Sequence, residues 1–170
     1  MMLAKLLLLA TLHGVTPDAS PQPRALTLTP MLGQSAVLYL SNDVTAGGAG
    51  GTLGVELGYR GTYLARFDAG MLWLLGNAGV ARLALGLQHD GPWAPAVWLT
   101  FGVLWGERLE FLHSDGTRPA LPSWSIGVRG SPLRFVSETG TFSALEPGIG
   151  SDLSGGVWLE LGVLQVGLRF

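Results

Sequence analysis

The sequence alternates apolar residues with small or charged ones in one short segment after another, and this pattern restricts the fold to β-structure. The clearest alternation sets Leu53, Val55, Leu57 and Tyr59 against Gly54, Glu56, Gly58 and Arg60. Successive side chains of a strand point to opposite faces of the sheet. Each such strand therefore has one apolar face and one face that is charged or carries almost no side chain.

The composition indicates which kind of sheet this pattern favours. Hydrophobic residues make up 48% of the chain and charged residues only 13%, whereas about a quarter of the residues of a soluble domain are charged. No segment supplies the roughly 18 uninterrupted apolar residues of a transmembrane helix, and the 26 glycines disfavour helices. A closed barrel is the other architecture that satisfies every backbone polar group in lipid.

Alternation bounded by turn residues predicts eight strands and no helix, at 33–41, 52–60, 62–75, 79–88, 93–112, 120–130, 132–145 and 156–170. An even number of strands lets a meander return both termini to one side. We expect short turns at 60–61, 89–92 and 130–132, longer loops at 42–51, 106–122 and 139–156, and one tight link at 76–79. The predicted fold is all-β, an eight-stranded antiparallel up-and-down transmembrane β-barrel.

The first twenty residues are expected to be a secretory signal peptide. Lys5 is followed by an apolar run over 6–12 that is too short to span a bilayer. Two imperfect cleavage sites end at Gly14 and Ala19, and an N-terminal core helix is the alternative interpretation. Three prolines between 17 and 23 disfavour regular structure. We therefore expect a signal peptide over 1–20, a tail over 21–32 and a barrel domain over 33–170.

In the segment 157–170, the alternate residues near its end share one apolar strand face, formed by Leu164, Val166, Leu168 and Phe170. It resembles the C-terminal strand of bacterial outer-membrane β-barrels, in which a terminal aromatic residue is the family's assembly signal. Together with the signal peptide and the alternating strands, it makes the chain similar to the small eight-stranded members of that family. The resemblance implies a bacterial outer-membrane location, contact with lipid, and recognition by the barrel assembly machinery. The last strand of a soluble sheet is the alternative.

Two strand facings stay undecided at this stage. The strand 33–41 is apolar on both faces. In the last strand, the odd-numbered residues from Val157 to Val163 would lie on the inner face, with Glu160 outside. A β-bulge near Gly162 would exchange the two faces and restore the alternation.

Seven charged residues fall on the face that also carries the small residues, and we expect this face to line the interior: Glu56, Arg66, Asp68, Arg82, Arg129, Arg134 and Glu138. An eight-stranded barrel is just wide enough to be filled by side chains. An unpaired buried charge would cost several kcal/mol. These groups are therefore expected to pair across the interior and to leave no open channel.

Aromatic residues near the strand ends are expected to face outward as girdles at the two membrane interfaces: Trp73, Trp93, Trp105, Trp124, Trp158 and Phe170. The alternative is a soluble lipocalin-like barrel that packs these rings in its core and binds an apolar ligand. That fold would point Leu53, Val55, Leu57, Leu83, Leu85 and Leu87 inward.

The sequence offers little catalytic chemistry. A net charge of −2 favours no nucleic-acid partner, and the absence of cysteine excludes disulfides and thiolate metal sites. No two histidines have a metal-ligand spacing. The one compact candidate is His113-Ser114-Asp115 at a predicted loop tip. Lipid A deacylases of the family place His and Ser two residues apart on one strand face, with a downstream acid, so the adjacent pair departs from their motif.

We therefore expect a monomeric outer-membrane barrel without catalytic site, cofactor or metal, with a structural or surface-interaction role. A barrel enzyme that modifies lipid A is the alternative from the enzyme class.

Overall fold

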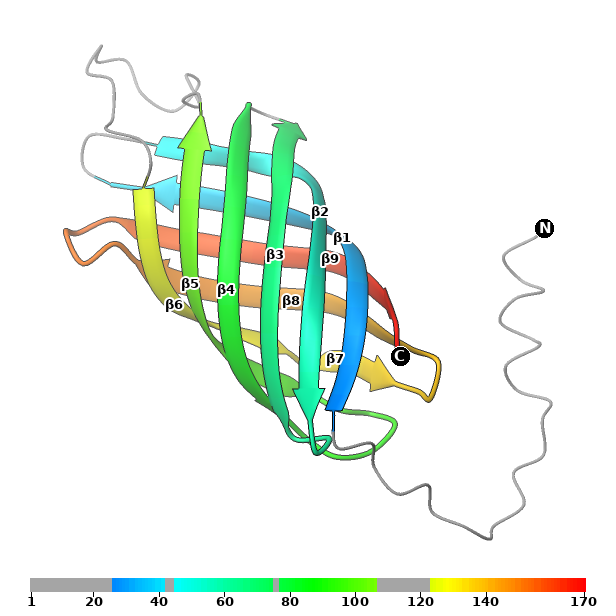
Figure 1. Ribbon diagram of the computed structural model, residues 1–170. Coiled ribbons are helices and arrows are strands. Elements are labelled where there is room, and N and C mark those ends of the chain that lie inside the picture. Colours follow the sequence, from blue (N-terminus) through cyan, green and yellow to red (C-terminus); the bar gives the residue numbers. More distant parts are fainter. Residues whose placement is uncertain (1–25, 42–44, 75–76, 107–122) are drawn as a thin grey trace, which may run out of the picture.

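The computed structural model describes residues 26–41, 45–74, 77–106 and 123–170, and these residues form β-strands joined by turns (Figure 1). No helix among them is long and apolar enough to cross a membrane. The strands are β1 (Leu26–Leu40), β2 (Thr45–Tyr59), β3 (Tyr63–Leu74), β4 (Ala78–Gln88), β5 (Ala96–Gly106), β6 (Ser123–Ser131), β7 (Leu133–Val136), β8 (Gly140–Ser151) and β9 (Val157–Leu168).

These strands form one closed antiparallel sheet. Each strand from β1 to β6 pairs with the next one in the chain, β1 pairs with β9, and β8 pairs with both β6 and β7. β6 and β7 meet β8 in the same register, as the pairs Arg129↔Gly148 and Leu133↔Ala144 show. They therefore act as two halves of one strand. The fold is an eight-stranded antiparallel β-barrel, as the sequence predicts.

The connections fall into two sets at opposite ends of the barrel. The turns 60–62, 89–95 and 137–139 lie at the end where β1 begins and β9 finishes, which we call the terminal end (Figure 1). Backbone hydrogen bonds join Leu28 and Phe170 at that end. The strands β1, β3, β5 and β8 finish at the other end, called the loop end.

The predicted turn at 130–132 is wrong, because the chain continues through Pro132 as one strand. A proline has no N–H to give to a ladder, and it is tolerated where a strand lacks a regular partner. At this point the neighbouring strand β5 is just beginning, and its pairing reaches only the bridge Ala96↔Ser131. The hairpin lies instead at 137–139, and most of the predicted loop 139–156 is β8.

Two other boundaries also differ from the sequence prediction. β1 begins at Leu26, inside the predicted tail 21–32, and the predicted Gly-rich loop 42–51 is strand from Thr45 onward. A Cβ on Gly47 or Gly50 would lie about 2 Å from a neighbouring carbonyl oxygen, so these glycines allow close approach of adjacent backbones. These glycines therefore let the loop-end half of β2 bend close to its neighbours, and Figure 1 shows β2 curving together with β1.

A β-bulge is present near Gly162, where it decides the facing that the sequence left open. On β1, Gln34 pairs with Leu164 while Ser35 pairs with Gly162, which leaves Val163 as an extra residue in β9. The extra residue exchanges the two faces of the strand. As a result Glu160 faces inward, while Leu159 and Leu161 face outward. In β1, the undecided strand, Val37 and Tyr39 face inward and the flanking residues face outward.

Candidate functional site

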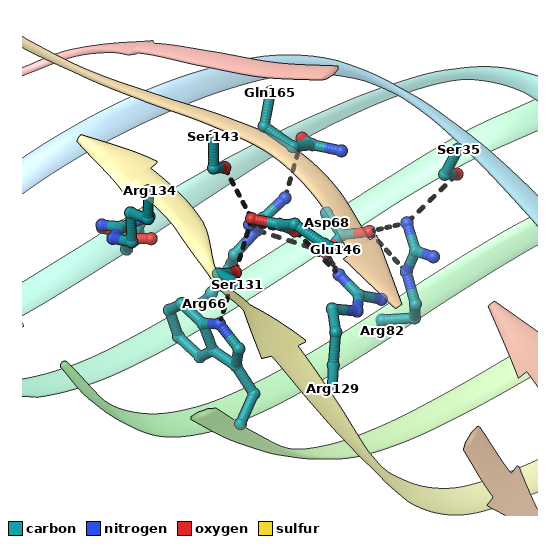
Figure 2. Close-up of polar contacts among 12 residues, drawn as sticks. Ser35, Arg66, Asp68, Arg82, Arg129, Ser131, Arg134, Ser143, Glu146 and Gln165 are labelled. Carbon is teal, nitrogen blue, oxygen red and sulfur yellow. Dashed lines mark hydrogen bonds and ion pairs between the residues drawn. The ribbon is translucent and has the colours of Figure 1, made fainter. Parts of the chain in front are cut away.

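The most distinctive chemistry of the molecule is an ionic network in the middle of the barrel interior (Figure 2). Six of the seven residues assigned to the interior from the sequence are buried: Glu56, Arg66, Asp68, Arg82, Arg129 and Arg134. They come from β2, β3, β4, β6 and β7. Because inward side chains of several strands converge on a narrow lumen, groups distant in sequence become neighbours.

Asp68 and Glu160 hold one side of the network. Asp68 accepts a hydrogen bond of 2.6 Å from Nε of Arg82 and lies 3.5 Å from Nε of Arg66. Glu160 accepts a bond of 2.5 Å from Nη2 of Arg129 and lies 3.5 Å from Arg82. Asp68 also lies 4.0 Å from Arg129, so each carboxylate serves at least two guanidinium groups and no single pair stands alone.

Glu146 is the carboxylate with the most partners. Its Oε2 lies 3.3 Å from Arg66 and 3.8 Å from Arg129. Its Oε1 accepts hydrogen bonds of 2.7 Å from Ser131 and 2.6 Å from Ser143. Its side chain is completely buried. A buried carboxylate is tolerated only when it is paired and hydrogen-bonded in this way.

A second, smaller group lies nearer the terminal end. Arg134 donates a bond of 2.5 Å to Glu56 and another of 3.1 Å to Gln88. The Arg134 guanidinium also lies over the ring of Trp98, 5.8 Å from its centroid. Trp98 in turn donates to Ser131 at 3.2 Å, which connects the smaller group to the central network.

The assignment of Glu138 to the interior is wrong, because this residue is exposed in the turn between β7 and β8. Sequence reasoning also missed Glu146 and left the facing of Glu160 undecided. A signal that both acids lie inside existed in the charge count. The four interior arginines are opposed by only Glu56 and Asp68 once Glu138 is removed, so an enclosed interior required two more acids.

Apolar side chains occupy the interior on both sides of the network. Toward the loop end, Tyr39, Leu72, Leu104 and Trp158 belong to one buried cluster, in which the rings of Tyr39 and Trp158 meet edge to face. Toward the terminal end, Leu64, Ala84, Ala96 and Trp98 form another. The charges therefore lie between two apolar layers, away from solvent.

The outer face is apolar and ends in aromatic rings. Trp73, Trp105 and Trp124 are exposed near the loop end, and Trp93 and Phe170 near the terminal end. Trp158 was assigned to this girdle from the sequence, and that assignment is wrong. The bulge in β9 turns Trp158 into the interior, where it is fully buried.

The alternative of a soluble lipocalin-like barrel is also wrong. It requires the leucines of β2 and β4 to face the lumen, yet Leu53 is 67% exposed and Leu85 is 57% exposed on the outer face. Polar groups inside and apolar groups outside are the inverse of the pattern of a soluble protein. They are the pattern of a transmembrane barrel.

The described residues offer few groups for catalysis. Their one histidine, His89, is exposed in the turn between β4 and β5. No group of three or more metal-ligating side chains is found among them. The buried hydroxyls of Ser131 and Ser143 donate to Glu146, an arrangement that fixes a carboxylate. The candidate His113-Ser114-Asp115 lies outside the described residues.

Fold and interior together define a small eight-stranded β-barrel of the outer-membrane type. Among solved structures the chain is similar to Neisserial surface protein A (NspA), with a TM-score of 0.55 and 10% identity over 86% of this chain and 97% of that chain. The N-terminal β-barrel domain of Pseudomonas aeruginosa OprF gives a TM-score of 0.49 and 15% identity, covering 82% and 97% of the two chains. The likeness to NspA shows the fold. No protein-family model and no curated protein sequence matches the chain.

Proposed function

We propose that the protein is an integral barrel of the bacterial outer membrane with a side-chain-filled interior, acting as a structural or surface-interaction protein without catalytic activity. The single observation that carries this proposal is the inverted polarity of the barrel. Eight paired charges lie inside, whereas leucines and aromatic rings cover the outside. Such an outer surface is stable against hydrocarbon and would expose a large apolar area in water.

The ends of the barrel support an orientation in the membrane. Bacterial barrels have short periplasmic turns at the end that carries both termini, and longer loops outside. The terminal end of this barrel therefore faces the periplasm. The loop end, where β1, β3, β5 and β8 finish and where residues 152–156 join β8 to β9, faces the exterior and provides the surface for interaction. The similar protein NspA is named as a surface protein.

Cell fractionation tests the location. We expect the full chain in the outer-membrane fraction, extractable only by detergent, and migrating faster on gels before heating than after it. Recovery as a freely soluble periplasmic protein would refute the proposal. Chemical cross-linking of the same membranes should give a monomer.

The proposed partner in assembly is the barrel assembly machinery, which would recognise the segment 157–170. Phe170→Ser should reduce the amount of folded barrel in the outer membrane. Phe142→Ser is the matched control, because Phe142 is another exposed aromatic on the outer face. Equal reductions in both variants would show that only the aromatic surface matters.

Absence of catalysis is tested at the one compact candidate. Replacing His113 by Ala should leave the lipid A of the expressing cells unchanged by mass spectrometry. A wild-type-dependent change in lipid A that the variant abolishes would instead establish the enzyme alternative.

A further inference from the structure

A hollow that the barrel itself does not fill interrupts the apolar outer face of the described residues. Its volume is about 670 Å³, and its lining is almost entirely apolar. Outward residues of the six strands β1 to β6 line it, among them Leu57, Tyr63, Ala65, Leu85 and Leu99. Gly58 and Gly86, which have no side chain, contribute to the same lining.

The hollow has a simple cause in the strand register. Ala65 pairs with Leu57 on β2 and with Leu85 on β4, and Leu85 pairs with Leu99 on β5. These residues form one row across the outer face of the sheet. Ala65 is the smallest member of the row, so a depression remains between the neighbouring leucines. Along β3, the outward neighbours of Ala65 are the large side chains of Tyr63 and Phe67, of which Tyr63 lines the hollow.

The rim of the hollow at the terminal end is polar and carries a cation. Tyr59 and Tyr63 belong to the lining, and their rings lie 6.5 Å apart. The exposed Arg60 holds its guanidinium 5.2 Å from the centroid of Tyr59. One carboxylate is close to this turn, because Oδ1 of Asp90 lies 3.5 Å from the position that a Cβ on Gly61 would take.

We propose that this hollow binds an anionic phospholipid, with an acyl chain over Ala65 and the phosphate at Arg60. The proposal rests on the membrane location proposed above. Hydrocarbon fits a groove of apolar lining, and a phosphate complements an arginine that stands at its rim. Tyrosine rings prefer the level of lipid headgroups, which places this rim where a phosphate lies. The terminal end would face the periplasm, so the lipid belongs to the inner leaflet.

Native mass spectrometry of the full-length barrel in detergent micelles tests the site, with phosphatidylglycerol as the titrated probe. We expect one retained lipid per wild-type chain. Ala65→Leu fills the hollow and should weaken binding about tenfold or more, because the acyl chain loses buried contacts. Ala69→Leu is the matched control, since Ala69 is the next outward alanine of the same strand and does not line the hollow.

A charge variant tests the headgroup. Arg60→Gln should reduce the preference for phosphatidylglycerol over phosphatidylcholine by about fivefold, the effect of one cation near a membrane surface. Arg169→Gln, at a partly exposed arginine of the terminal end that does not line the hollow, should keep the preference.

Heat-modifiable migration of each variant shows separately whether the barrel inserts and folds. If the wild type never inserts, the proposed function fails. If all variants insert and Ala65→Leu retains lipid as well as Ala69→Leu does, the lipid site alone is refuted. A dimer that Ala65→Leu abolishes would assign the hollow to a second copy of the chain and would likewise refute the lipid site.

Discussion

At the residue scale, stability depends on a few buried acids that each serve several arginines. Glu146 shows this most clearly, since two arginines and two serines converge on it. Removing its charge would leave cations enclosed without a full set of partners. Breaking a buried ion pair in this way is more damaging than losing the net energy of the pair, because the remaining charge stays desolvated.

Glu146→Gln should therefore lower the free energy of unfolding by about 3 kcal/mol or more. Denaturant unfolding in detergent micelles measures the change. Glu138→Gln, at an exposed turn position, should change it by less than about 0.5 kcal/mol. A double variant with Arg66→Met should lose less than the sum of the two single losses, because the groups share one interaction. Additive losses would contradict the network.

The sequence predicts the inward charges of the regular strands well. Glu56, Arg66, Asp68 and Arg82 sit in strands whose alternation is unbroken, so period two assigns their facing. The same rule fails for Trp158, since one extra residue in β9 reverses the faces upstream of it. It also does not place Glu146, because the Gly and Pro residues of 140–151 make this strand resemble a loop in the sequence.

At the element scale, the β8–β9 hairpin is held closed by its first loop residue. Oδ1 of Asp152 accepts backbone hydrogen bonds of 2.8 Å from Ser154 and from Gly156. Its Oδ2 accepts a bond of 2.5 Å from the Tyr39 hydroxyl. The tyrosine bond is the leading cause that lowers the pKa of Asp152 to about 2, and the backbone bond from Ser154 adds to it. These bonds favour the charged carboxylate.

Because the folded pKa lies below the ordinary value of 3.8, this loop contributes stability above pH 4 and loses it as the pH falls toward 2. Tyr39→Phe should raise the pKa of Asp152, which NMR titration of the labelled carboxyl group measures. Tyr59→Phe, at the opposite end of the barrel, should leave it at about 2. An unchanged value in Tyr39→Phe would show that the tyrosine bond does not form.

The sequence predicts which strands exist better than it predicts where they begin and end. The alternation identifies β3, β4 and the main part of β5, whereas Gly and Pro residues give wrong strand boundaries at two places. In β2, glycines provide close backbone approach at a bend, and the composition alone is that of a loop. At Pro132, a residue that ends most strands coincides with the point where β5 has only begun. Both depend on neighbouring strands, which the local sequence does not contain.

At the scale of the whole molecule, the outer face should respond to charge according to depth. Leu83 lies mid-strand in β4, whereas Leu74 is the last residue of β3 beside Trp73. Leu83→Arg should cost about 2–4 kcal/mol of folding free energy in lipid bilayers, and Leu74→Arg about 0–1 kcal/mol. Reversible unfolding from liposomes measures both. Equal small effects of both substitutions would mean that the outer face of the barrel contacts water and not lipid.

The ladder between β1 and β9 joins the two ends of the described chain, with Leu40 opposite Val157. It is the most non-local contact of the barrel, so it is slow to form and comes late in folding. Until it forms, two strand edges carry unpaired backbone N–H and C=O groups, and the lipid hydrocarbon offers these groups no hydrogen-bond partner. Insertion and closure must therefore proceed together. A chain stalled before 157 would present two adhesive edges, and its natural fate is aggregation or proteolysis.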